Sequence, residues 1–97
     1  MAAPDVWVAK DDGSDIIRAT AIAAVGRDYS GNITVRLTGG EQAAVTIVTA
    51  DGRADTPADF HLQLLRIIGA LSDTAESAII RPLPDTSQGW SWQTGRL

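Results

Sequence analysis

The most regular hydrophobic pattern in the chain runs from Asp55 to Leu71, where apolar residues recur with the period of an α-helix. At 100° per residue, one side of this helix is apolar: it carries Phe60, Leu64, Ile67, Ile68 and Leu71, with Leu65 at its edge. The opposite side carries Gln63, Arg66 and Ala70. A helix with one apolar side needs a surface to cover, and the rest of the chain is expected to supply it.

Three residues mark the expected start of this helix. Thr56 is an N-cap candidate, because its hydroxyl can accept a hydrogen bond from a free N–H group of the first turn. Pro57 would occupy the first helical position, where its missing N–H costs nothing. Asp59 would place a negative charge near the positive end of the helix dipole. These signals predict an amphipathic helix over about residues 57–71.

The remaining apolar segments are short and alternate with polar residues, which is typical of β-strands. The strand candidates are residues 6–9, 33–38, 41–50 and 78–81. The alternation in 41–50 predicts Val45 and Ile47 on the inner face and Val48 on the opposite one. Pro82 and Pro84 should end the last strand, since proline cannot donate to a ladder.

Residues 15–28 are compatible with two structures. Ser14 and Gly26 would cap a helix over this segment. Alternatively, 16–18 and 22–27 are strands separated by a turn at 19–21. An Asp12-Gly13 turn precedes the segment, a turn at 29–32 follows it, and Gly39-Gly40 forms a further hairpin loop. These neighbouring turns favour the strands.

Together the patterns predict an α+β fold: an antiparallel β-meander of about five to six short strands with one helix packed on one face. The order of elements resembles small PH-like barrels and open sheet-plus-helix modules, although no sequence motif carries this resemblance. Residues 1–84 are expected to form a single domain, and residues 85–97 a C-terminal tail that contains two tryptophans.

Composition excludes several classes of function. The formal net charge is −4 and the basic residues are scattered, so neither nucleic acid nor an anionic membrane is an expected partner. The chain has no cysteine, no apolar run long enough to span a membrane and no secretory signal, which favours a cytoplasmic location. Seven of the eight basic residues are arginine and alanine is frequent, as in proteins of high-GC bacteria and their phages.

Few residues are candidates for catalysis or for binding a ligand or metal. His61, the only histidine, lies within the apolar stripe of the predicted helix, and it and Arg36 are the candidate ligand-binding residues. Arg36 would share the outer face of the sheet with Arg18 and Arg27. The acidic residues of 11–15 do not have the spacing of a calcium loop and are interpreted as turn residues. No catalytic residue, metal site or cofactor is predicted.

Tryptophan accounts for three of the five aromatic residues, and two of the three lie in the polar tail. Trp90 and Trp92 either fold back onto the chain's own sheet near Trp7, or pack onto a partner or second subunit. Both alternatives remain open from the sequence. The three tryptophans are therefore the candidate interface residues, and a homodimer through the tail is one form of that interface.

The favoured hypothesis is a non-enzymatic protein-interaction or oligomerisation module. The first alternative is a small-ligand-binding or enzymatic domain that uses His61 with a nearby Asp or Arg. A further alternative is an acidic inhibitor, such as an antitoxin, that binds a basic partner.

Overall fold

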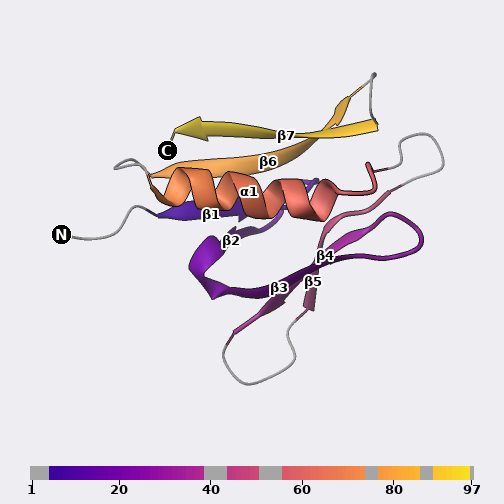
Figure 1. The fold of residues 1–97 in the computed structure, drawn as a ribbon, viewed down its shortest axis with the longest axis horizontal. Helices are drawn as coiled ribbons and strands as arrows, with labels where there is room; N and C mark the ends of the chain where they lie inside the picture. Colours follow the sequence, from indigo (N-terminus) through magenta and orange to yellow (C-terminus); the bar gives the residue numbers. More distant parts are fainter. Residues whose placement is uncertain (1–4, 39–43, 51–55, 74–76, 86–88, 97) are drawn as a thin grey trace.

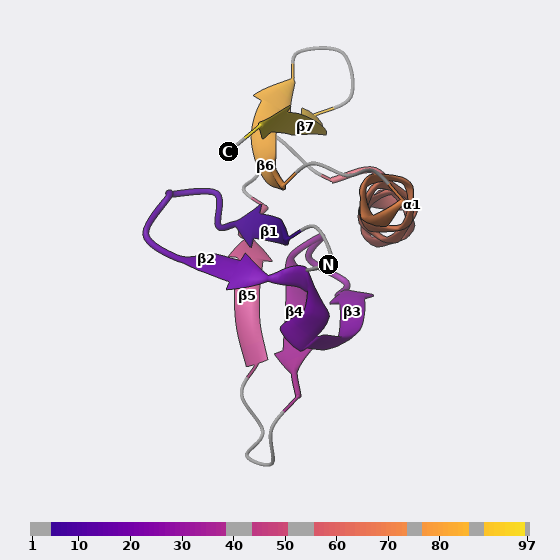
Figure 2. The same ribbon diagram turned by 90° about the vertical axis from the view of Figure 1, so that its left-hand side faces the viewer.

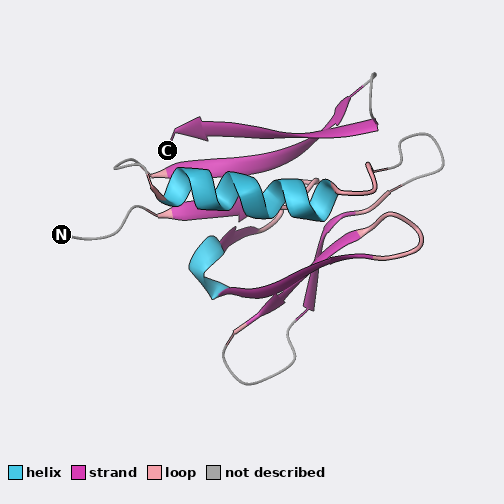
Figure 3. Cartoon of the chain, in the orientation of Figure 1, coloured by secondary structure: helices cyan, strands magenta, loops and turns pink. Residues whose placement is uncertain are grey.

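The computed structural model describes residues 5–38, 44–50, 56–73, 77–85 and 89–96, and within these it confirms the α+β class (Figure 1, Figure 3). One α-helix, α1 (Phe60–Ser72), packs on seven strands arranged in two sheets of this described part. The strands are β1 (Val6–Ala9), β2 (Ile16–Arg18), β3 (Ile22–Arg27), β4 (Ile33–Leu37), β5 (Ala44–Val48), β6 (Ala78–Asp85) and β7 (Gly89–Arg96). A 3₁₀ turn, η1 (Ala19–Ala21), joins β2 to β3.

The strands β3, β4 and β5 form an antiparallel meander, as predicted. The pairing of β4 with β5 contains a bulge, because Ile33 pairs with Val48 while the next residue, Thr34, pairs with Thr46. Ile47 and Val48 are consequently both fully buried. The prediction that Val48 lies opposite the inner face was wrong, since a bulge breaks the two-residue alternation on which it depended.

The second sheet has the order β2-β1-β6-β7. Its β1–β2 hairpin turns at Gly13, which has a φ of 73°, a conformation that favours glycine. The strands β1 and β6 pair in parallel, from Val6 opposite Ala78 to Val8 opposite Ile80. The predicted meander did not include this pair, because no local pattern links strands so far apart in the sequence.

The strand β6 does not end at the prolines. It runs to Asp85, with Pro82 opposite Trp92 and Pro84 opposite Trp90 of β7. The prediction of a strand end at Pro82 was wrong for a specific reason. The strand β1 pairs only as far as Ile80, so among the described strands the rest of β6 has a paired neighbour on the β7 side alone, and proline is tolerated on such an edge.

Residues 15–28 adopt the strand alternative, with β2, η1 and β3 in the predicted positions. The turn that follows is held by Asp28, whose carboxylate accepts hydrogen bonds from the backbone N–H of Asn32 and of Ser30, each at 2.9 Å. These bonds, that of Asn32 above all, lower the pKa of Asp28 below its ordinary value. The predicted Gly39-Gly40 loop lies outside the described residues.

The helix begins at Phe60, later than predicted, and Thr56 does not cap it. The Thr56 hydroxyl instead donates to the carbonyl of Gly31 at 2.6 Å and accepts from Nε of Arg27 at 3.0 Å. Pro57 lies in the preceding turn, where its carbonyl accepts from the N–H of Phe60 at 3.0 Å. The N-cap prediction was wrong because this hydroxyl is committed to a tertiary contact that fixes the helix approach to the β3–β4 turn.

One continuous core joins both sheets and the helix. Its buried members are Val6, Val8, Ile17, Ile33, Val35, Ile47, Val48, Phe60, Leu64, Ile80 and Trp90. The helix contacts β1, β3 and β7 and so closes the space between the sheets from one side. Viewed along its axis, α1 has strands on one side only (Figure 2). Among the described residues, none of the helices has the length and apolarity that crossing a membrane requires.

Candidate functional site

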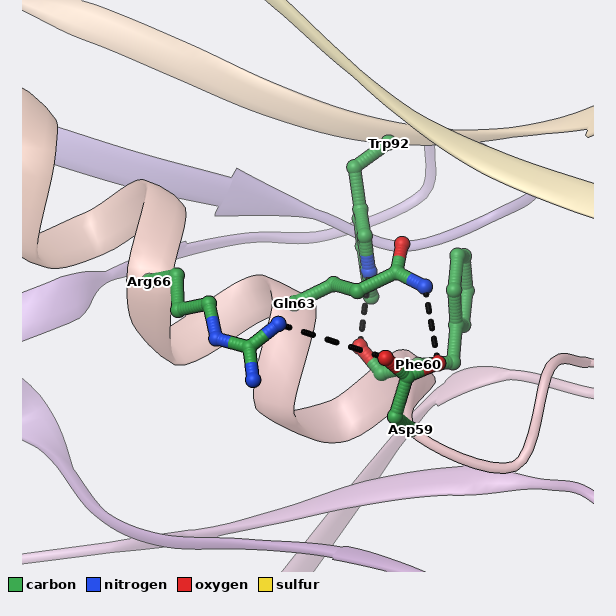
Figure 4. Close-up of polar contacts among 5 residues, drawn as sticks. All are labelled: Asp59, Phe60, Gln63, Arg66 and Trp92. Carbon is green, nitrogen blue, oxygen red and sulfur yellow. Dashed lines mark hydrogen bonds and ion pairs between the residues drawn. The ribbon is translucent and has the colours of Figure 1, made fainter.

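The two tail tryptophans pack against the chain's own core. Trp90 is 7% exposed and belongs to the core cluster. Trp92 stacks on Phe60 with ring centroids 4.4 Å apart and planes 14° apart, and its Nε1–H donates to the Phe60 carbonyl at 2.9 Å (Figure 4). The strand β7 is thus fixed to the start of α1 by an aromatic pair and a hydrogen bond.

Trp7, on β1, is half-buried, and the guanidinium group of Arg18 lies over its ring. The guanidinium carbon of Arg18 is 5.0 Å from the Trp7 ring centroid, and Arg18 also lies 3.9 Å from the Asp5 carboxylate. Both tail tryptophans thus have contacts within their own chain, Trp90 in the core and Trp92 with Phe60. The role of the three tryptophans in a partner interface stays a prediction.

The candidate ligand-binding residues lie apart. His61 is partly buried on α1, and its Nδ1 is enclosed without a hydrogen-bond partner among the described residues. Arg36 is exposed on β4 and lines a shallow concavity of about 310 Å³ together with Arg27 and Thr34. Arg18 belongs to the other sheet, so the three arginines do not gather on one face.

A second concavity, of about 350 Å³, lies between the β1–β2 turn and β6 and is lined by Lys10, Asp11, Asp12 and Arg81. Its acidic groups have structural roles. Asp11 accepts from the backbone N–H of Thr49 at 2.9 Å, which links the two sheets. Asp12 accepts from the N–H and hydroxyl of Ser14, and these bonds lower its pKa. Within the described residues, no group of three or more metal-binding side chains gathers.

The least expected feature is a second apolar stripe on α1. Leu62 is 44% exposed and Leu65 is 48% exposed. Gly69 is exposed one turn after Leu65 on the same line of the helix, and Ala58 is exposed in the turn that precedes α1. At 100° per residue, Leu62, Leu65 and Gly69 fall within an arc of about 60°, on the side away from Phe60 and Leu64. We call these three residues together with Ala58 the outer stripe.

Sequence reasoning missed this surface. It placed Leu65 at the edge of the buried side and gave Leu62 no role. The signal was present in the spacing, because positions 58, 62, 65 and 69 repeat every three or four residues. In the structure the buried side of α1 is centred on Phe60 and Leu64, which leaves both leucines facing outward.

Figure 4 shows three polar residues at the start of α1 and along it, Asp59, Gln63 and Arg66. Their helical positions place them beside the outer stripe, on one flank. Asp59 accepts a hydrogen bond from Nε2 of Gln63 at 3.0 Å, and its other carboxylate oxygen lies 4.0 Å from Nη1 of Arg66. The flank therefore has an acidic group near the start of α1 and a basic group about two turns later. An apolar line beside ordered charges is a typical composition for a contact surface.

The comparisons with known proteins give no assignment. The chain matches no protein-family model, and neither a curated protein nor a solved structure is significantly similar to it.

Proposed function

We propose that this protein is a non-enzymatic interaction module whose binding surface is the outer stripe of α1. The observation that carries the proposal is the joint exposure of Leu62 and Leu65. An isolated exposed leucine needs no explanation, but two on one helix line with only small residues beyond them form a continuous apolar surface. Helices of this kind bind partners through apolar residues spaced three and four apart.

The free energy available from burying the two leucines supports a contact of moderate strength. Full burial of a leucine side chain contributes about 1.5–3 kcal/mol, and about half of each of these leucines is still exposed. A partner that covers both would gain about 2 kcal/mol from them, which corresponds to roughly thirtyfold in affinity. Loss of both leucines should therefore weaken partner binding by at least an order of magnitude.

The alternative of a ligand-binding or enzymatic site at His61 has less support. Nδ1 of His61 has no hydrogen-bond partner among the described residues, so no carboxylate there orients the ring as a catalytic base requires. The ring lines neither of the two concavities described above. An acidic inhibitor remains compatible with the net charge of −4, and it would be one kind of interaction module.

The proposal is tested by affinity purification from the cells that produce the protein. The bait variants are the wild type, Leu62→Gln/Leu65→Gln and a matched control, Ile16→Gln, which removes an exposed apolar side chain from β2. We expect a binding partner that the wild type and the control retain and the double variant loses. A partner retained equally by all three baits would contradict the proposal.

A further inference from the structure

We propose that the partner of the outer stripe is a second copy of this chain, bound with the two α1 helices antiparallel about a twofold axis. This inference rests on the proposed function and specifies its partner. Three features of α1 support it: the order of residues along the stripe, the charges on its flank and the open surface at its end.

The order of residues along the stripe is self-complementary. Ala58, Leu62, Leu65 and Gly69 are separated by four, three and four positions, a spacing that reads the same in both directions. In an antiparallel pair, Leu62 lies against Leu65 of the second copy, and Ala58 lies against Gly69 of the second copy. A twofold axis between the helices repeats each contact, which is the requirement for a closed, isologous dimer.

The flanking charges favour the antiparallel orientation. Asp59 and Arg66 are seven residues apart, on the same flank of the stripe. Antiparallel pairing brings Asp59 of each copy beside Arg66 of the other, so two attractive pairs form across the axis. A parallel twofold pair would instead place this flank against the opposite flank of the second copy, where His61 and Ile68 lie, so the charges would gain no opposite partner. The existing contact between Arg66 and Asp59 is long, at 4.0 Å, and exposed, so both groups are accessible to a second copy.

The described residues leave the far end of the stripe accessible. A Cβ atom built on Gly69 would have no neighbour within 4 Å, so the end of the stripe is open. The helix has 13 residues and is therefore about 20 Å long. A contact made by one helix of this length buries less surface than a standard interface, which buries about 800 Å² per partner. We therefore expect a weak, reversible dimer rather than a permanent one.

Sedimentation velocity from about 10 µM to about 1 mM protein tests the dimer, because a weak complex populates only toward the upper limit. We expect the mean mass of the wild type and of Ile16→Gln to rise toward twice that of one chain. The Leu62→Gln/Leu65→Gln variant should stay monomeric with an unchanged far-UV circular dichroism spectrum. A wild type that stays monomeric throughout, or a double variant that still dimerises, would overturn the inference.

Two charge variants test the pairing itself. Arg66→Glu leaves only acidic groups on the flank, and Asp59→Lys leaves only basic ones, so each variant alone should dimerise at least about fivefold more weakly than the wild type. An equimolar mixture should recover dimers, because every pair across the axis is again opposite in charge. A mixture that is no more dimeric than its components would overturn the antiparallel arrangement.

The outcomes separate this inference from the proposed function. A monomeric wild type combined with an α1-dependent partner in the affinity purification would reject self-association and retain the interaction surface. Equal retention of partners by the double variant, together with dimers that do not need Leu62 and Leu65, would reject both.

Discussion

The contact between Trp92 and Phe60 gives the sharpest prediction about the tail. If β7 belongs to the core, shortening Trp92 should destabilise the monomer; if the tail serves only a partner, the monomer should be indifferent. Trp92→Phe keeps a ring over Phe60 but removes the hydrogen bond from Nε1 to the Phe60 carbonyl. Trp92→Ala removes the stack as well.

The expected magnitudes follow from these contacts. Loss of the hydrogen bond should lower the free energy of unfolding by about 1 kcal/mol. Loss of the half-buried indole should lower it by about 3 kcal/mol, near the lower end for tryptophan truncations. A domain of this size has a total stability of about 5–15 kcal/mol, so the second loss is a large fraction of the whole.

Urea unfolding followed by far-UV circular dichroism measures both effects. With a slope of about 1–3 kcal/mol per molar urea, the midpoint should fall by roughly 1–3 M for Trp92→Ala and by about a third of that for Trp92→Phe. Tyr29→Ala is the matched control, because the Tyr29 ring is fully exposed and its loss should change stability by less than about 0.5 kcal/mol. Equal midpoints for Trp92→Ala and Tyr29→Ala would show that Trp92 does not stabilise the monomer.

Three further predictions concern single residues. Thr56 is 3% exposed, and Thr56→Val removes its hydroxyl together with two tertiary hydrogen bonds. The substitution should lower the free energy of unfolding, measured with urea, by about 2 kcal/mol. Thr46→Val, on an exposed strand face, should lower it by less than about 0.5 kcal/mol. Gly69→Ala should raise the free energy of unfolding by up to about 1 kcal/mol, because the helix gains propensity and the new Cβ meets nothing; a lower melting temperature would contradict this. Asp28 has a lowered pKa in the folded state, so its contribution is present above the unfolded value of 3.8 and is lost as the pH falls through the folded value. Asp28→Asn should make the urea midpoint fall less steeply between about pH 5 and pH 2 than in the wild type, and an unchanged pH profile would contradict the turn's dependence on this carboxylate.

The parts of the fold that were predictable are those specified by local patterns. The alternation of Ile33 and Val35 defines β4, and the Asp-Gly pair ending at Gly13 defines the first hairpin. The apolar period around Phe60 defines the helix. In each case the residues that carry the signal are within a few positions of one another, so sequence spacing determines which side chains share a face.

The parts that were not predictable depend on contacts between distant segments. Proline is allowed in β6 only because β1 stops pairing at Ile80, and that register does not show in the sequence around Pro82. Thr56 has the residue type and position of an N-cap, but its hydroxyl is engaged by Gly31 and Arg27, 25 and 29 positions away. Local preference was overridden in both cases by tertiary structure.

The candidate surface was missed for a related reason. A helical wheel shows which residues share a side, but it does not show where the buried side ends. Leu65 lies next to the apolar side and was counted with it, whereas the sheets and β7 cover only the side centred on Phe60 and Leu64. How much of α1 is covered depends on where β7 lies. The sequence was compatible with a tail that packs on its own chain and with one that packs on a partner.

Disulfide trapping can detect whether the outer stripe of α1 binds a second copy in antiparallel orientation. The chain has no cysteine, so Ala58→Cys and Gly69→Cys each introduce a single thiol. In the proposed dimer, position 58 faces position 69 of the other copy, while like positions are about 16 Å apart, too far for a disulfide. We predict that mild oxidation links the two variants when they are mixed and leaves each unlinked when it is alone. Efficient linkage of either variant to itself, or no linkage in the mixture, would contradict the antiparallel dimer.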